Sequence, residues 1–303
     1  MPDAIEALRT PDERFANLPG FPFAPHYREG LEGYDGLRVH YLDENRAVPS
    51  GRTVLCLHGQ PTWCYLYRKM IPVFAAAGHR VVAPDLFGFG RSDKPVDDAV
   101  YTFGFHRRML MRFIEALDLQ RVTLVVQDWG GLLGLTLPME YPDRIDRLII
   151  MNTGLGVGRS PGPGFDAWKS FVAAKPDFDI AALMKRSVPG LSDAEAAAYD
   201  APYPDRRYRA GARRFPALVP VTPDMEGADV STRAAQFFRE QWNGRTFMAI
   251  GMQDPVLGPP VMHALAKVIR GCPPPLELPQ AGHFTQEHGR EVAERALAEF
   301  GDS

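Results

Sequence analysis

The sequence predicts an α/β fold in which a mostly parallel central sheet is flanked by helices and interrupted by one helical insertion. Short β-branched apolar runs alternate with amphipathic helical stretches, which is typical of a parallel sheet. After Asn152 this alternation stops in a segment rich in Gly, Pro, Ala and Arg, and strand patterns return only near residue 246. A chain of 303 residues is long enough for one core carrying an inserted lid.

Each predicted element follows from its local pattern. Buried parallel strands are predicted at "TVLCL" (53–57), "RVVAP" (80–84), "VTLVVQ" (122–127) and "RLIIMN" (147–152), and later strands at "TFMAIG" (246–251) and "PLELPQ" (275–280). The stretch "HRRMLMRFIEALDL" (106–119) has helical spacing, and the alternating "LRVHYLD" (37–43) predicts an antiparallel edge strand. We therefore expect residues 1–153 and 228–303 to form the core and residues 154–227 to form a helical cap domain.

Composition excludes several classes of partner. With 45% hydrophobic residues, 23% charged residues and a net charge of −3, the chain has no basic stripe for nucleic acid or anionic lipid. Its start is acidic and polar, unlike a signal peptide, and no apolar run approaches the ~20 residues of a membrane span. Three cysteines without metal-ligand spacing indicate reduced thiols. We expect a cytoplasmic monomer without metal or cofactor.

The stretch "VVQDWGG" places Asp128 where a predicted strand turns into a helix. Gly130 and Gly131 allow the close approach of strand and helix that a nucleophile elbow requires, and the residue at its tip points out of the sheet. Asp128 is therefore a candidate nucleophile. The alternative is that Asp128 only caps the following helix, since Asp is a favoured N-cap residue.

Two more candidate catalytic residues follow later strands. Asp254 in "AIGMQDPVLGP" and His283 in "PQAGHF" come at the carboxyl ends of strands, where open α/β sheets place their sites. With Asp128 they give the order nucleophile, acid, histidine. Taken singly, Asp254 could be only a turn residue and His283 only a surface-loop residue. Three such residues in this order favour a triad.

The turn "HGQP" follows the strand at 53–57. It is placed to present the backbone N–H of Gln60 toward the nucleophile as half of an oxyanion hole, with the N–H of Trp129 as the other half. Pro61 raises the chance of a cis peptide bond in this tight turn. His58 is interpreted as a buried structural residue.

These motifs resemble the α/β-hydrolase superfamily and, within it, the haloalkane dehalogenases. The resemblance rests on "HGQPTW", "VVQDWGG", "AIGMQDPVLGP" and "AGHF" and extends from about Leu37 to the C-terminus. It implies an α/β-hydrolase fold in the branch whose catalytic acid, here Asp254, follows the late strand. Val126 departs from the usual elbow, which has a glycine at this position.

The chemistry of an aspartate nucleophile supports the same activity. A carboxylate that attacks an sp3 carbon forms an alkyl ester, which water can hydrolyse at the carbonyl of the aspartate, whereas a serine would form a stable ether. His283 would activate that water, and Asp254 would orient the histidine. The expected substrate is a small apolar haloalkane, converted to an alcohol, a halide ion and a proton.

A departing halide needs donors that do not neutralise Asp128, and an uncharged indole N–H meets that need. Trp129 is one candidate. The resemblance implies that a cap tryptophan, here Trp168, is the second, although Trp168 could instead only anchor the cap. Phe165 and Phe171 are candidate lining residues of an apolar cavity. The resemblance also implies that Gln60 helps to hold the catalytic water or the oxyanion, unless it is only a surface turn residue.

Three alternative functions share parts of this pattern. An epoxide hydrolase would use the same aspartate with cap tyrosines as acids, and Tyr199, Tyr203 and Tyr208 keep that alternative open. A fluoroacetate-type dehalogenase is disfavoured because Trp129, not an arginine, follows the nucleophile. A non-catalytic receptor of this fold is disfavoured because all three triad candidates are present.

Overall fold

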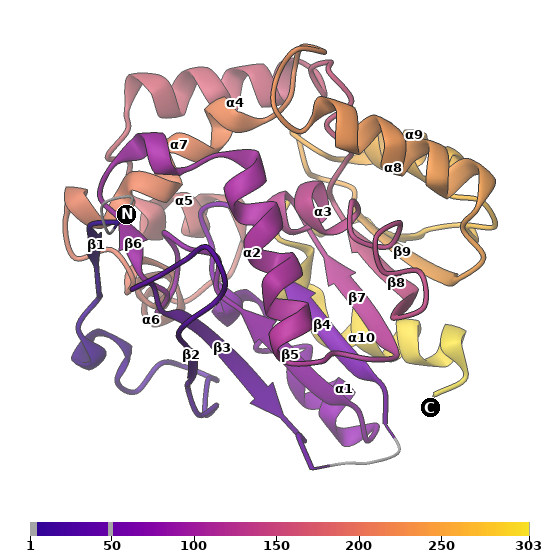
Figure 1. Cartoon of the computed structure of the whole chain (residues 1–303), viewed down its shortest axis with the longest axis horizontal. Helices are drawn as coiled ribbons and strands as arrows, with labels where there is room; N and C mark the ends of the chain where they lie inside the picture. Colours follow the sequence, from indigo (N-terminus) through magenta and orange to yellow (C-terminus); the bar gives the residue numbers. More distant parts are fainter. Residues whose placement is uncertain (1–4, 48–50, 303) are drawn as a thin grey trace.

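The computed structural model describes residues 5–47 and 51–302, and an eight-stranded sheet forms its centre (Figure 1). The strand order is β10-β9-β8-β7-β4-β5-β3-β2. Their bounds are β2 (His26–Arg28), β3 (Val39–Glu44), β4 (Thr53–Leu57), β5 (Arg80–Pro84), β7 (Val122–Val126), β8 (Ile145–Met151), β9 (Arg245–Gly251) and β10 (Leu276–Leu278). A separate pair joins β1 (Ala7–Leu8) to β6 (Lys94–Pro95). The predicted α/β fold with a mostly parallel sheet is confirmed.

The strands from β10 to β5 pair in parallel, and β3 and β2 pair antiparallel. The predictions for β4 and β5 match the observed bounds residue for residue. The prediction that residues 37–43 form an edge strand is wrong, because β2 pairs along the outer side of β3. Five of the six β3 residues are buried, as a strand between two neighbours requires.

Helices cover the sheet. Their bounds are α1 (Ile71–Ala76), α2 (Phe103–Ala116), α3 (Trp129–Gly134), α4 (Pro163–Ala174), α5 (Ile180–Ser187), α6 (Asp193–Asp200), α7 (Ala210–Leu218), α8 (Ala228–Glu240), α9 (Pro259–Val268) and α10 (Gly289–Phe300). Helix α2 starts three residues earlier than predicted because the hydroxyl of Thr102 accepts a hydrogen bond from the N–H of Phe105 and caps it. Figure 1 shows α2 in front of the sheet and the short α3 at the arrowhead end of β7.

Helices α4 to α7 all lie within the segment 154–227, and no described residue of that segment is in a strand. Asp179 caps α5, and Ser192 with Glu195 forms a capping box at the start of α6. Figure 1 shows α4 and α7 lying across the end of the sheet toward which β7 points. The segment therefore covers the sheet edge where the predicted catalytic residues lie.

No helix in the described ranges combines the length and the apolar character needed to cross a bilayer.

A buried ion pair between Arg68 and Glu287 also contacts helix α6. Arg68, after the short helix at Cys64–Tyr67, donates two hydrogen bonds to Glu287, at 2.7 and 2.9 Å, and one to Glu195 of α6, at 2.8 Å. The side chains of Arg68 and Glu287 are only 2% and 3% exposed. Arg68 also donates to the hydroxyl of Tyr199 in α6 at 3.1 Å. Because both charges are buried, each depends on the other for compensation.

We predict that Arg68→Met destabilises the protein by about 3 kcal/mol, because it leaves the Glu287 carboxylate buried with Lys69 as its remaining ion-pair partner. Urea unfolding measures the change. Arg290→Met is the matched control, since Arg290 is 74% exposed and its contact with Glu294 is 3.6 Å long. Equal midpoints for the two variants would contradict the prediction.

Candidate active site

Asp128 lies at a strained turn between β7 and α3. Its φ of 49° and ψ of −124° place a non-glycine residue in a conformation that L-residues rarely adopt. Hydrogen bonds from the Asp128 N–H to the Asn152 carbonyl and from the Thr153 hydroxyl to the Asp128 carbonyl hold the turn. The turn has the geometry of a nucleophile elbow. The side chain of Asp128 makes no capping bond to α3, which removes the alternative interpretation.

Small residues make this turn possible. A Cβ on Gly130 would lie 1.9 Å from the carbonyl oxygen of Leu57, and one on Gly131 would lie 2.1 Å from the hydroxyl of Thr153. A Cβ on Gly59 would lie 2.3 Å from Oδ1 of Asp128 itself. The strand, the helix and the neighbouring turn therefore approach one another at distances that only glycine permits.

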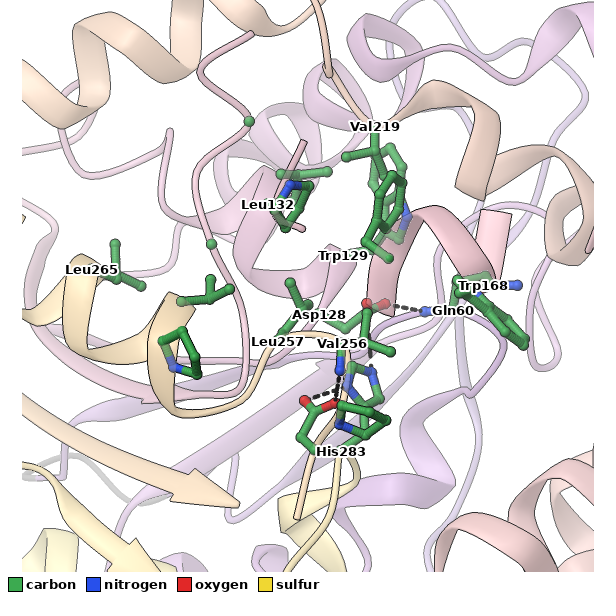
Figure 2. A pocket seen from close by; sticks show the side chains of 18 of the residues that line it. Gln60, Asp128, Trp129, Leu132, Trp168, Val219, Val256, Leu257, Leu265 and His283 are labelled. Atoms are coloured by element: carbon green, nitrogen blue, oxygen red, sulfur yellow. Dashed lines mark hydrogen bonds and ion pairs between the residues drawn. The ribbon is translucent and has the colours of Figure 1, made fainter. Parts of the chain in front are cut away.

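The carboxylate of Asp128 has two polar neighbours of different kinds (Figure 2). Oδ1 accepts a hydrogen bond from the backbone N–H of Gln60 at 2.7 Å, and Oδ2 lies 3.6 Å from Nε2 of His283. The Gln60–Pro61 peptide bond is cis. Trp129 begins α3, where backbone N–H groups have no partner within the helix. The carboxylate thus lies beside one donor placed to stabilise an oxyanion, the N–H of Gln60, and directly before the first N–H groups of α3.

His283 lies between the two carboxylates that the sequence analysis singles out, Asp128 and Asp254. Nδ1 of His283 is 2.8 Å from Oδ2 of Asp254. Asp254 also accepts hydrogen bonds of 2.8 Å from the side chain of Asn152 and from the backbone N–H of Val256. Burial raises the pKa of Asp254, but the charge of His283 and these hydrogen bonds outweigh it and lower that pKa. Asp254 is therefore held as a carboxylate, and Nδ1 of His283 carries the proton between them.

The pKa of His283 reflects opposing effects. Burial lowers it, while the charge of Asp254 and the charge and hydrogen bonding of Asp128 raise it, and the raising effects prevail. Because part of the increase comes from the charge of Asp128, a reaction that removes this charge would lower the pKa of His283.

Sequence reasoning missed two polar residues of the site. Asn152 follows β8 and holds Asp254, and Gln127 follows β7 and contacts His283. The Gln127 side-chain nitrogen lies 2.9 Å from Nε2 of His283 and 3.1 Å from its carbonyl oxygen. Each of the two is a polar residue that terminates an apolar strand run at the same end of the sheet as Asp128. This position is the sequence signal that could have identified them.

A cavity of about 1070 Å³ opens onto the Asp128 carboxylate. Figure 2 shows Trp168 on one side of Asp128 and Leu265 on the other, so the cavity extends from the carboxylate in two directions. The side chains that line it include the apolar Trp129, Leu132, Phe165, Trp168, Val219, Val256, Leu257 and Leu265 and the charged Arg159, Arg186 and Arg239. The chamber suits a small apolar molecule.

The aromatic candidates differ in position. Trp129, Trp168 and Phe165 line the cavity. Phe171 does not; its ring stacks on that of Trp168, with centroids 5.7 Å apart, and supports the tryptophan from behind the cavity wall. The side-chain amide of Gln60 is also directed elsewhere, since it donates to the carbonyl of Ala212 in α7 at 2.7 Å.

The three tyrosines of segment 154–227 that could act as acids do not line the cavity. The Tyr199 hydroxyl donates to Glu287, and the Tyr203 hydroxyl donates to the carbonyl of Pro61. Neither they nor Tyr208 belong to the residues that line the cavity in the described part of the chain. Tyrosine acids at an epoxide oxygen therefore have no structural basis here. His58 is fully buried and accepts a hydrogen bond from Leu86, in agreement with its predicted structural role.

Within residues 5–47 and 51–302, one group of buried residues has ligand atoms close enough for a metal, namely His40, Cys64 and Asp85. The carboxylate of Asp85 already accepts hydrogen bonds from His40 and from the backbone N–H groups of Cys64 and Arg91. This group lies outside the cavity and is explained by its internal hydrogen bonds.

Comparison with known proteins agrees with this geometry. A family model described as alpha/beta hydrolase fold matches residues 52–289. A haloalkane dehalogenase of Psychrobacter cryohalolentis is 44% identical, with 98% of both chains covered. Haloalkane dehalogenase 1 of Mycobacterium tuberculosis H37Rv is 45% identical over 97% of this chain and 98% of its own length.

A solved structure is also similar. The haloalkane dehalogenase DpaA of Paraglaciecola agarilytica NO2 superposes with a TM-score of 0.94 at 51% identity, covering 97% of this chain and 98% of its own. That structure is described as tetrameric, which does not fit the expectation of a monomer for this chain. The fold, the family match and the relatives at 44–51% identity agree, and the chain therefore belongs to the α/β-hydrolase fold family and, within it, to the haloalkane dehalogenases.

Proposed function

We propose that this haloalkane dehalogenase cleaves the carbon–halogen bond through a covalent ester on Asp128. The observation that carries the proposal is the placement of the Asp128 carboxylate, which faces the cavity from a strained turn and lies 3.6 Å from His283 and 2.7 Å from the Gln60 N–H. Asp128 is the nucleophile, His283 the base and Asp254 the acid that orients the base.

In the first step an oxygen of Asp128 attacks the carbon that bears the halogen. The new C–O bond takes its electron pair from the carboxylate, and the C–X pair leaves with the halide. Trp129 and Trp168 donate indole N–H bonds to the departing anion. Both line the cavity, and an uncharged donor does not form an ion pair with Asp128.

In the second step a water oxygen attacks the carbonyl carbon of the ester, and Nε2 of His283 takes a proton from that water. The negative charge that develops on the carbonyl oxygen of the ester is stabilised by the backbone N–H groups of Gln60 and Trp129. The ester bond then breaks, the alkoxide leaves as the alcohol with the proton from His283, and one proton passes to solvent. The carboxylate of Asp128 is restored.

The side chain of Gln60 has a different proposed role from the one expected. Because its amide donates to the Ala212 carbonyl, it joins the oxyanion turn to cap helix α7, while its backbone N–H serves the oxyanion. Phe165 forms part of the apolar wall, and Phe171 supports Trp168.

We further propose that residues 154–227 act as a cap domain over a core of residues 1–153 and 228–303, and that the protein is cytoplasmic. The helices of that segment contribute Phe165, Trp168 and Leu183 to the cavity wall. The free thiols of Cys56, Cys64 and Cys272 support a reducing compartment.

Purified protein is predicted to release halide from bromo- and chloroalkanes of two to six carbons, and Asp128→Asn is predicted to lose at least ~100-fold of this activity, since an amide is a poor nucleophile. Halide is measured with 1,2-dibromoethane and 1-bromobutane, and diol from styrene oxide in parallel. The intact mass of the variant controls for deamidation back to Asp. Diol without halide would favour an epoxide hydrolase.

Trp168→Phe is predicted to weaken bromide binding several-fold, because it removes one N–H donor while keeping an aromatic ring. Bromide quenching of tryptophan fluorescence measures the dissociation constant. Trp242→Phe is the matched control, since the Trp242 N–H donates to the Thr246 hydroxyl away from the cavity. An unchanged constant in Trp168→Phe would remove Trp168 from the halide site.

We predict that the chain assembles as a tetramer, as its 51% identical relative from Paraglaciecola does. Light scattering on a gel-filtration column should give a mass four times the 33.7 kDa of the chain. A peak at the mass of one chain would contradict this prediction and support the monomer expected from the sequence.

A further inference from the structure

Gln127 is fully buried next to the catalytic residues, and the mechanism above gives it no task. It precedes Asp128 directly. Its side-chain nitrogen lies 2.9 Å from Nε2 of His283 and 3.1 Å from the carbonyl oxygen of the same residue. Its amide oxygen has no hydrogen-bond partner among the described residues. A buried amide with one satisfied and one unsatisfied end is costly, so its orientation needs a reason.

The two contacts fix the direction of the amide. A carbonyl oxygen only accepts hydrogen bonds, so the group facing the His283 carbonyl must be the NH2 of Gln127. The second hydrogen of that NH2 is then available to Nε2 of the same histidine. Since Nδ1 of His283 faces the Asp254 carboxylate and carries a proton, Nε2 of a neutral ring has a lone pair that accepts this hydrogen.

A protonated ring does not fit the same contact. An imidazolium would direct its Nε2–H at the Gln127 NH2, two donors 2.9 Å apart. Turning the amide over would relieve that conflict but would place the amide oxygen 3.1 Å from the His283 carbonyl oxygen. The observed orientation therefore fits the neutral histidine and opposes the charged one.

Gln127 and Asp128 act on the same nitrogen in opposite directions. The charged groups that face the ring are Asp254, which follows β9, and Asp128, which follows β7, and both favour the imidazolium. The ring of Phe284 packs edge-on against it, with centroids 5.0 Å apart. An imidazolium paired with Asp128 would occupy the carboxylate that must attack, and would have no free lone pair for the water of the second step.

We propose that Gln127 is a positioning residue whose N–H opposes protonation of His283 at Nε2, against the two carboxylates that favour it, and so helps to leave Asp128 free to attack and His283 able to act as a base. This rests on the proposed roles of Asp128 and His283. When the ester has formed, the charge of Asp128 is gone, and the attacking water replaces the Gln127 N–H at Nε2. The second bond, to the His283 carbonyl, keeps the amide in place for the next cycle.

The direct test is the pH dependence of kcat/KM, which reports protonation of the free enzyme. A donor to Nε2 favours the neutral ring and lowers the pKa of His283, so its removal raises that pKa. Gln127→Met keeps the approximate shape of the side chain but removes its N–H donors. It should shift the acid limb of the kcat/KM profile to higher pH by about one unit. Gln127→Glu adds a negative charge and should move it further in the same direction.

Gln286→Met is the matched control, because Gln286 is also fully buried, lies three residues beyond His283 and makes no hydrogen bond to it. Its acid limb should stay where the wild-type limb lies. A Gln127→Met variant that loses activity by one factor at every pH, with an unmoved acid limb, would show a merely structural amide and overturn the proposal.

A second measurement uses the wild-type chain and does not depend on whether the variants fold. With ¹⁵N-labelled histidine, the ring nitrogen shifts of His283 at the pH of maximal kcat/KM should show an unprotonated Nε2. An imidazolium signal would overturn the proposal. Suppose that Asp128→Asn abolishes halide release but Gln127→Met leaves the acid limb of kcat/KM at the wild-type pH. That pair of results would support the catalytic roles of Asp128 and His283 and reject only the role of Gln127.

Discussion

The strained turn at Asp128 is the constraint on which the rest of the site depends. A φ of 49° at a residue with a Cβ persists only where surrounding contacts determine the backbone, and here they come from both sides. Gly130 fits against Leu57 of β4, and Gly131 fits against Thr153 after β8. Because the three parallel strands β4, β7 and β8 are neighbours in the sheet, they fix the turn rigidly. The carboxylate is thereby lifted out of the sheet into the cavity.

The electrostatic arrangement around this carboxylate follows from what the turn brings near it. In the described part of the chain, the ion-pair partner of Asp128 is His283, and no lysine or arginine pairs with it. Permanent cations would form an ion pair with the nucleophile, whereas a histidine can be neutral or charged within one reaction cycle. In the proposed mechanism Asp254 and Asp128 favour the charged ring and Gln127 favours the neutral one. The balance among these three neighbours permits one histidine to take a proton from water and return it to the alcohol within the second step.

Much of the fold could be predicted because its strands are buried on both faces. "TVLCL" and "RVVAP" are continuous apolar, β-branched runs, and both predicted strands match the observed ones. The edge strand β2 has only three residues, His26–Arg28, without a run to identify it, and it forms because β3 supplies its hydrogen-bond partners. Strands held mainly by a neighbour leave little trace in their own sequence.

The order of the candidate catalytic residues along the sequence was predictable, but the directions in which the side chains of the site point were less so. Asp128, Asp254 and His283 were found because each follows a strand, and the structure brings the three together. Phe171 is three residues from Trp168 on α4, so the two rings stack on each other and only one lines the cavity. Gln127 and Asn152 were missed because a single buried amide carries no motif. Their roles depend on neighbours that only folding supplies.

The central claim is that the oxygen of the product alcohol comes from Asp128 and not directly from water. A single turnover in H₂¹⁸O, with enzyme in excess over 1-bromobutane, tests it directly. The covalent mechanism predicts unlabelled butanol and ¹⁸O incorporated into the peptide that contains Asp128, because water attacks the carbonyl carbon of the ester. Labelled butanol in that first turnover, with an unlabelled Asp128 peptide, would show direct attack of water on the substrate and would contradict the covalent mechanism.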